Sequence, residues 1–246
     1  MQRVAKPKTV SRREREFQQR EDAVVEAARQ ILQREGFEGV SMGRIADDLE
    51  YSRGTIYLHF LCKEEIILAV GIRAQQLRMS LMEQVLQMPG NARERFVAAG
   101  EVIRVVSPRY TGGEMLIYMD GIREKVRPEF RERMFEYEGQ LFMKGARIVQ
   151  EAIDAGDLTL PGGLSAESFT YIHWANIYGA MCISNSGAPL DGLGVDDPRE
   201  IAKTFGRTYL DALGWKPLSG EFDYRETMRR IYRNVITPDI IAQFQP

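Results

Sequence analysis

Apolar residues recur along most of the chain with the three- and four-residue spacing of an amphipathic helix. Val24, Ala28 and Ile31 lie on one face of a helix expected over residues 19–35, and Gly36 ends that helix. The same pattern predicts helices at residues 42–49, 52–60, 63–88, 92–106, 112–121, 128–155, 166–184, 198–213 and 223–235. The sequence shows no paired strands with a hairpin turn, no internal repeat and no low-complexity block, so it predicts an all-α fold.

Two of the predicted helices, 42–49 and 52–60, are short and separated by a tight turn. This spacing is typical of a helix-turn-helix motif, whose second helix enters the major groove of DNA. We therefore expect a three-helix DNA-binding domain over residues 19–65. A basic, flexible tail at 1–18 precedes it, and a larger helical ligand-binding and dimerisation domain at 66–246 follows it.

The second helix of the motif carries side chains suited to DNA on the face opposite its core residues, Ile56 and Phe60. Arg53 can donate two hydrogen bonds to guanine, and Gly54 permits close approach of the backbone. Hydroxyl, phenol, imidazole and ammonium groups at neighbouring positions can donate to phosphate oxygens. Arg44 is equally consistent with an ordinary surface charge. The predicted DNA contacts are Ser41, Arg44, Ser52, Arg53, Gly54, Thr55, Tyr57, His59 and Lys63.

Residues 41–64 resemble the signature of TetR-type transcriptional regulators. The most specific part is the run Gly-Thr-Ile-Tyr-Leu-His-Phe at 54–60, followed by Lys63-Glu64. The resemblance covers about 45 residues, from the first predicted helix to the start of the fourth, and the rest of the chain matches only in architecture. It implies a homodimeric regulator, usually a repressor, that binds a double-stranded DNA operator. Such a regulator leaves its operator when a small molecule enters the C-terminal domain.

Two positions depart from the family's pattern. Glu50 stands where the family often has glycine in the turn, so we expect Glu50 at a positive φ, where a residue with a Cβ is strained. Its carboxylate could also lie near phosphate and weaken DNA binding. Cys62 occupies a position that is usually small and polar, and we interpret it as a buried or half-buried residue and not a sensor.

The overall charge argues against a general nucleic-acid binder, because 33 Lys and Arg residues are outweighed by 35 Asp and Glu residues. The distribution weakens this argument. Residues 1–20 carry seven basic and two acidic side chains, whereas residues 21–65 carry five basic and ten acidic ones. The basic segment is either a solvated terminus or an arm that follows the phosphate backbone. DNA binding by a dimer needs only a few cations directed at phosphates.

The C-terminal part is rich in aromatic and methionine residues that could line a cavity, although such a stripe is more often plain core. His173 and Asn176 are the expected polar anchors, and the expected ligand is apolar or aromatic. The residues predicted to line this cavity are Met115, Tyr118, Met119, Phe135, Phe142, His173, Trp174, Asn176 and Tyr178.

The helices at 166–184 and 198–213 are the expected dimer interface. Small residues on the first helix allow close approach, and aromatic residues on the second can fill the partner's groove, which would form a four-helix bundle. The arginine-rich helix at 223–235 is expected to present a solvated face. The predicted interface residues are Ala175, Gly179, Ala180, Phe205 and Tyr209.

The sequence leaves two other classes of function to compare with a regulator, namely an enzyme and a helical adaptor. An enzyme is disfavoured because His59 and His173 lie in different domains and no catalytic triad, metal-ligand spacing or glycine-rich phosphate loop is evident, so we expect no cofactor and no metal. A helical adaptor that has lost DNA binding would explain Glu50 and the acidic segment. Apolar runs such as Ile66–Gly71 are far shorter than the roughly 20 residues of a membrane span. Two cysteines and the lack of a secretory signal favour the cytoplasm.

Overall fold

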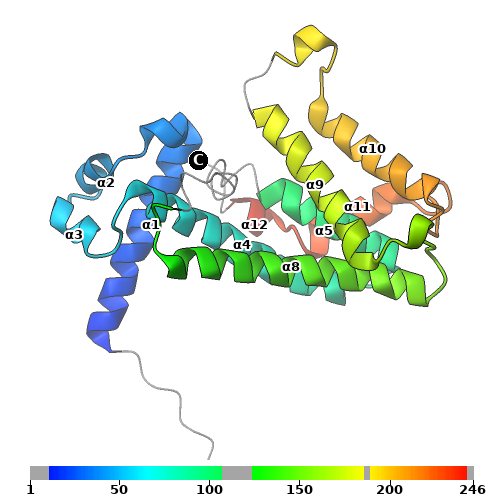
Figure 1. Ribbon diagram of the computed structural model, residues 1–246, viewed down its shortest axis with the longest axis horizontal. Coiled ribbons are helices and arrows are strands. Elements are labelled where there is room, and N and C mark those ends of the chain that lie inside the picture. Colours follow the sequence, from blue (N-terminus) through cyan, green and yellow to red (C-terminus); the bar gives the residue numbers. More distant parts are fainter. Residues whose placement is uncertain (1–10, 107–123, 186–188, 243–246) are drawn as a thin grey trace, which may run out of the picture. The chain divides into compact units, whose positions relative to one another are not determined.

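The computed structural model describes residues 11–106, 124–185 and 189–242, and within these ranges the ordered elements are all helical (Figure 1). The all-α fold is therefore confirmed, while the helix expected at 112–121 lies outside the described residues. In this part of the chain no helix is long and apolar enough to cross a membrane. The α-helices are α1 (Arg12–Gly39), α2 (Met42–Asp48), α3 (Arg53–Tyr57), α4 (Lys63–Gln87), α5 (Ala92–Val106), α8 (Pro128–Asp154), α9 (Ala166–Asn185), α10 (Pro198–Ala212), α11 (Tyr224–Asn234) and α12 (Pro238–Ala242).

The chain forms two compact units. Unit 1 comprises Met1–Gly71 and Tyr110–Arg131, and unit 2 comprises Ile72–Arg109 and Glu132–Pro246. This division differs from the single boundary after residue 65 that the sequence predicts, because the start of α8 belongs to unit 1. Both α4 and α8 contribute to each unit.

Helix α1 begins inside the segment that the sequence analysis interprets as a flexible tail. The Ser11 hydroxyl accepts a hydrogen bond from the Glu14 amide at 3.2 Å, and the Glu14 carboxylate accepts one from the Ser11 amide at 2.7 Å. This capping box satisfies two amides that a helix start leaves without partners. The expectation of a tail extending to residue 18 is therefore wrong for residues 12–18. At the other end, Gly36 leaves helical geometry as predicted, with φ of 71°.

The core of unit 1 is the apolar stripe predicted from the sequence. Val24, Ala28 and Ile31 of α1 are fully buried against Ile45 of α2 and Ile56 of α3. Phe60 and the first turns of α4 complete the cluster. Burial of each large aliphatic side chain stabilises the fold by about 1.5–3 kcal/mol, so this cluster fixes the positions of α2 and α3.

Glu50 joins α2 to α3 and has a φ of 54°. Within the described part of the chain, no other non-glycine residue has a positive φ. We expect Glu50→Gly to raise the free energy of unfolding by about 0.5–1 kcal/mol, because glycine adopts this geometry without a Cβ clash. Urea denaturation measures the change. Asp47→Gly, at an exposed helical position three residues earlier, should instead lower stability by about 0.3 kcal/mol, the difference in helix propensity between aspartate and glycine. A lower stability for Glu50→Gly would contradict the assigned strain.

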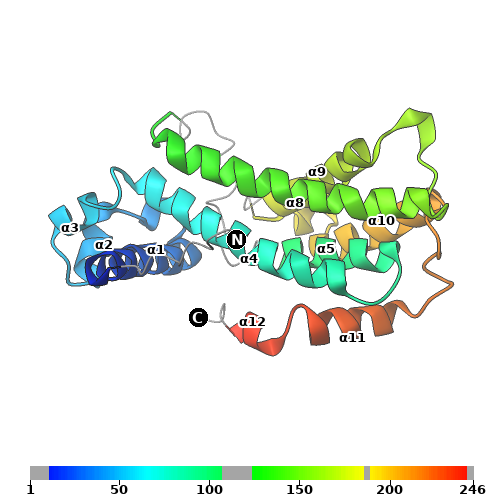
Figure 2. The ribbon, with the colours of Figure 1, turned by 90° about the horizontal axis from the view of Figure 1, so that it is seen from below.

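In unit 2, α11 packs against α5 (Figure 2). Buried Glu94 of α5 accepts a hydrogen bond from the Thr227 hydroxyl at 2.6 Å and pairs with the Arg230 guanidinium. The expectation of a solvated arginine face on the last helix is thus wrong for Arg230, although Arg225 and Arg229 are exposed. The buried carboxylate of Glu94 requires a cation, and Arg230 supplies it.

Candidate DNA-binding surface and ligand cavity

The turn between α2 and α3 is held by two serine caps. The Ser41 hydroxyl accepts a hydrogen bond from the Arg44 amide at 3.2 Å, and the Ser52 hydroxyl accepts one from the Thr55 amide at 3.0 Å. The Ser52 and Thr55 side-chain oxygens are also 2.8 Å apart. Both caps satisfy helix-start amides while leaving exposed hydroxyls at the surface of the motif.

Helix α3 presents the expected residues to solvent. Arg53 and Gly54 are exposed in its first turn, and Tyr57 is 52 % exposed although Ile56 beside it is fully buried. The Arg53 guanidinium lies against α2, with Nη2 only 3.1 Å from the place that a Cβ on Gly43 would occupy. Gly43 therefore leaves room for Arg53, a packing relation that the sequence analysis did not find.

The other two predicted cations already have partners within unit 1. Arg44 donates to Glu35, with Nη2 2.6 Å from Oε1, and this hydrogen bond lowers the pKa of Glu35 and raises that of Arg44. The Lys63 ammonium lies 4.1 Å from the centre of the Phe37 ring. Such a cation–π contact holds the ammonium in place at the start of α4.

His59 differs from its expected place. Its side chain is 2 % exposed and its ring lies 4.0 Å from that of Phe17, with Nδ1 3.8 Å from a Glu21 carboxylate oxygen. Burial lowers the pKa of His59, and the nearby Glu21 opposes that shift. The expectation of an exposed imidazole is therefore wrong, because Phe17 belongs to the helical part of the supposed tail and covers the ring.

The segment before α8 fastens the end of the helix-turn-helix motif. Glu65 is fully buried and accepts hydrogen bonds from the Arg127 Nε at 2.8 Å and the Leu61 amide at 2.8 Å. The same Arg127 donates to the His59 carbonyl at 3.0 Å. Burial alone would raise the pKa of Glu65, but these hydrogen bonds hold it below its ordinary value. Half-buried Cys62 contacts the same segment, and burial raises the pKa of its thiol, which confirms the expected packing role.

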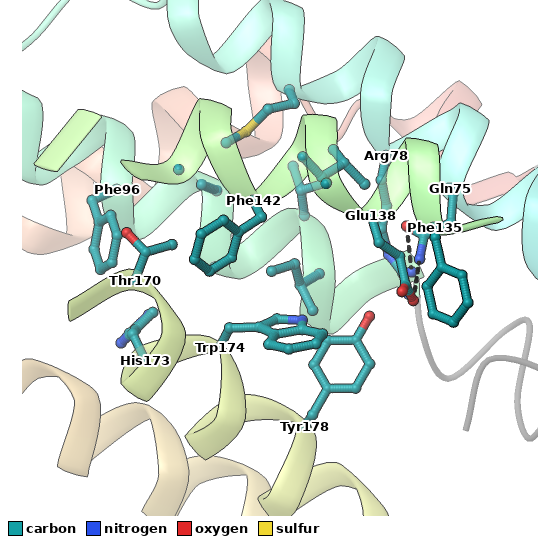
Figure 3. A pocket seen from close by; sticks show the side chains of 18 residues that line it. Gln75, Arg78, Phe96, Phe135, Glu138, Phe142, Thr170, His173, Trp174 and Tyr178 are labelled. Atoms are coloured by element: carbon teal, nitrogen blue, oxygen red, sulfur yellow. Dashed lines mark hydrogen bonds between the residues drawn. The ribbon is translucent and has the colours of Figure 1, made fainter. Parts of the chain in front are cut away.

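Unit 2 contains a cavity of about 370 Å³ enclosed by α4, α5, α8 and α9, which we call the main cavity (Figure 3). Its volume is within the usual range for small-molecule sites. The rings of Trp174 and Tyr178 meet edge to face at 5.1 Å, and Phe96 lies 4.5 Å from His173. Of the residues predicted for the ligand site, those placed on its wall are Phe135, Phe142, His173, Trp174 and Tyr178.

Three polar side chains lie together at one side of the main cavity (Figure 3). Arg78 donates to the Gln75 side-chain oxygen at 3.2 Å, and the Gln75 amide donates to Glu138 at 3.4 Å. One cation and one carboxylate are thus bridged by a neutral amide. This network was not predicted from the sequence. Its signal there is that Gln75 and Arg78 interrupt the apolar face of α4 beside Ala74 and Leu81.

His173 lines a second cavity as well. This cavity has a volume of about 340 Å³ and also includes Asn176, which therefore does not lie on the main cavity as predicted. Burial and the nearby positive charge of Arg104 lower the pKa of His173 to about 4. The imidazole is therefore neutral at physiological pH. Met115, Tyr118 and Met119 lie outside the described residues.

A comparison with protein families identifies the helix-turn-helix part of the chain. Residues 24–70, which include the whole helix-turn-helix motif, match the family model described as bacterial regulatory proteins, tetR family. Residues 24–70 therefore form a TetR-type helix-turn-helix domain.

Individual proteins are similar to this chain over most of its length. The HTH-type transcriptional regulator YfiR of Bacillus subtilis, itself uncharacterized, is 24% identical over 204 residues, which are 78% of this chain and 93% of YfiR. A Rhodococcus sp. RHA1 protein of unknown function has a similar fold, with a TM-score of 0.61, 22% identity and coverage of 79% and 95% of the two chains. A putative transcriptional regulator from Saccharomonospora viridis, in complex with choline, has a TM-score of 0.58 and 22% identity. The match covers 76% of this chain and 95% of that protein.

The predicted dimer residues lie on α9 and α10, which pack side by side (Figure 1). Ala175, Gly179 and Phe205 are exposed, whereas Ala180 and Tyr209 are half-buried. Tyr209 stacks between Phe205 and Phe169, with ring centres 6.1 Å and 5.9 Å away. Further large apolar side chains are exposed on the same two helices, namely Tyr171, Ile172, Ile183 and Ile201.

Proposed function

We propose that the chain is a homodimeric repressor that binds a palindromic operator through α3 and leaves it when a small molecule fills the main cavity. One observation carries this proposal. The same chain holds an exposed recognition face, formed by Arg53, Gly54 and Tyr57, and an enclosed aromatic cavity of about 370 Å³. A regulator that responds to a ligand needs both features, since effector and operator bind at distinct sites.

On the DNA side, the first turn of α3 would approach base edges in the major groove. Arg53 makes no hydrogen bond or ion pair with the residues described in the structure, so its guanidinium is free to pair with guanine. Tyr57 and the hydroxyls of Ser41, Ser52 and Thr55 would contact phosphates, and Arg44 and Lys63 would add positive charge. The buried His59 is removed from the proposed contacts and given a packing role.

On the dimer side, the exposed apolar residues of α9 and α10 are the proposed interface. Side chains such as Ile201 and Phe205, each 52 % exposed, are too numerous on one pair of helices to be explained as scattered surface residues. Pairing with the same two helices of a second copy would bury them in a four-helix bundle. The twofold symmetry of that dimer would match a palindromic operator.

The effector would act through the helices that contribute to both units. Gln75 and Arg78 of α4 and Phe135 and Glu138 of α8 line the main cavity, while the first turns of both helices belong to unit 1. A ligand that binds one arrangement of these helices more tightly would shift the population toward it. The choline bound by the Saccharomonospora protein supports a small organic molecule as the effector.

In-vitro selection of DNA fragments bound by the full-length protein tests this proposal. We expect enrichment of a palindrome whose half-sites are about one helical turn apart, with affinity that falls steeply as salt is added. Enrichment of no sequence, or affinity insensitive to salt, would favour the adaptor that has lost DNA binding.

A further inference from the structure

The second cavity differs in chemistry from the main cavity. Helices α5, α9, α10 and α11 line it, and each contributes at least one polar side chain: Arg104 from α5, Asn176 from α9, Lys203 from α10 and Tyr232 from α11. Four elements far apart in the sequence thus bring hydrogen-bonding groups to one cavity of about 340 Å³, which is open to solvent at Asn176 and Arg199. The main cavity is walled mostly by aromatic and aliphatic groups.

The charges on the wall of the second cavity are unbalanced. Arg104, Arg199 and Lys203 face a single carboxylate, that of Glu101. Glu101 is buried and accepts hydrogen bonds from the Tyr232 hydroxyl at 2.6 Å and from Arg104 Nε at 2.9 Å. Burial alone would raise the pKa of Glu101, but the Arg104 charge and the Tyr232 hydroxyl hold it below its ordinary value. The charge of Lys203 also lowers the pKa of Glu101, and this one carboxylate faces three cations, so the wall carries a surplus of positive charge.

Three hydrogen-bond donors on this wall are not used within the described part of the fold. Within the described residues, neither the Lys203 ammonium, the Asn176 amide nor the His173 ring forms a hydrogen bond or ion pair with another side chain or with the backbone. Asn176 is exposed and Lys203 is half-buried, so both donors are accessible to a ligand that enters this cavity. Because His173 is neutral, with a pKa lowered to about 4, it offers one N–H donor.

The two cavities meet at His173, which lines both. Gly100 marks the same junction. It lies on the wall of the main cavity, and a Cβ placed on it would be 3.7 Å from His173 Nε2 and 3.4 Å from Arg104 Nη1. On the main-cavity side, the positive charge of Arg78 is matched by the negative charge of Glu138. The surplus of positive charge therefore lies on the side of His173 that faces the second cavity.

We propose that the second cavity is an anion-binding subsite, which holds the carboxylate or phosphate head of an amphipathic effector whose apolar body fills the main cavity. The inference rests on the proposed function of the main cavity as the effector site. Lys203 and Arg199 supply the charge, and the Asn176 amide and the His173 N–H donate hydrogen bonds to the anionic oxygens. The effector is thus an organic acid or phosphate ester with a hydrocarbon or aromatic body.

Calorimetric titration of the full-length protein with four ten-carbon probes tests the proposal: decanoate, decyl phosphate, decanol and decyltrimethylammonium. We expect decanoate or decyl phosphate to bind at least about tenfold more tightly than decanol, and the better of the two names the head group. The cation should bind most weakly. Equal affinity for decanol and both anions, or preference for the cation, would overturn the anion subsite.

Variants of Lys203 test whether this side chain causes the preference for anionic probes. Lys203→Gln should weaken binding of the preferred anion about tenfold and leave decanol unchanged, whereas Lys203→Arg should keep the preference. Arg233→Gln removes an exposed positive charge from α11 away from both cavities and should change neither affinity. Equal weakening of anion and decanol by Lys203→Gln would reject the subsite. Failure of all four probes would reject the effector cavity itself, and operator binding of the ligand-free protein separately tests the DNA-binding role.

Discussion

Replacing Tyr57 by alanine is expected to weaken operator binding by at least about a hundredfold. The side chain is 52 % exposed on α3 next to the fully buried Ile56, so its loss leaves the core of unit 1 intact. Each half-site of a palindrome would lose one phosphate contact and the ring that supports it. Two losses of about 1.4 kcal/mol each combine to a hundredfold change. A gel shift with the selected operator measures it.

Met143→Ala is the matched control for this experiment. Met143 is 54 % exposed, nearly the same as Tyr57, but it lies on α8 in unit 2. We expect its operator affinity to equal that of the unaltered protein. Tyr57→Phe keeps the ring and removes the hydroxyl, so it should give an intermediate loss. Full operator retention by Tyr57→Ala, with unchanged helical content, would show that α3 does not read DNA.

Phe205→Glu is expected to separate the dimer into monomers of 28.1 kDa. The ring is 52 % exposed on α10 and stacks on Tyr209 at 6.1 Å, in the middle of the proposed interface. A twofold interface would contain the new carboxylate twice, and each would be buried without a partner at a cost of several kcal/mol. Sedimentation at micromolar concentration measures the mass, and operator affinity should fall with dimerisation.

The control for Phe205→Glu introduces the same charge elsewhere. Met143→Glu places a carboxylate on an equally exposed position of α8 and should leave the dimer intact. If Phe205→Glu remained a dimer while the control behaved the same, the α9–α10 face would be excluded as the interface. If both variants became monomers, the interface would include α8.

The helical pattern and the recognition helix could be predicted because both follow local rules. The stripe of Val24, Ala28 and Ile31 is buried as its spacing requires, and Ser41 and Ser52 cap the helices that follow them. The strained φ of Glu50 was also expected, from the family's preference for glycine there. These features depend on residues within a few positions of one another.

The errors concern contacts between residues distant in the sequence. His59 is spaced correctly for an exposed face, but Phe17 covers it, and no local pattern links the two rings. Asn176 is two residues from both Trp174 and Tyr178 on α9, about half a helical turn away, so it faces the other cavity. The signal for α1 was nevertheless present, because Ser11 followed by Glu14 is a capping-box sequence.

The anchoring of Glu65 by Arg127 limits how this DNA-binding unit can be used as a module. A fragment that ends at Gly71 would keep α1, α2 and α3 but lose both Arg127 and Phe130, whose ring lies 6.0 Å from that of Phe60. Glu65 would then be left as a buried charge without a cation, a defect of about 3–5 kcal/mol. A chimaeric protein that contains the DNA-binding unit must therefore also include residues 124–131, so two separate segments of the chain have to be transferred.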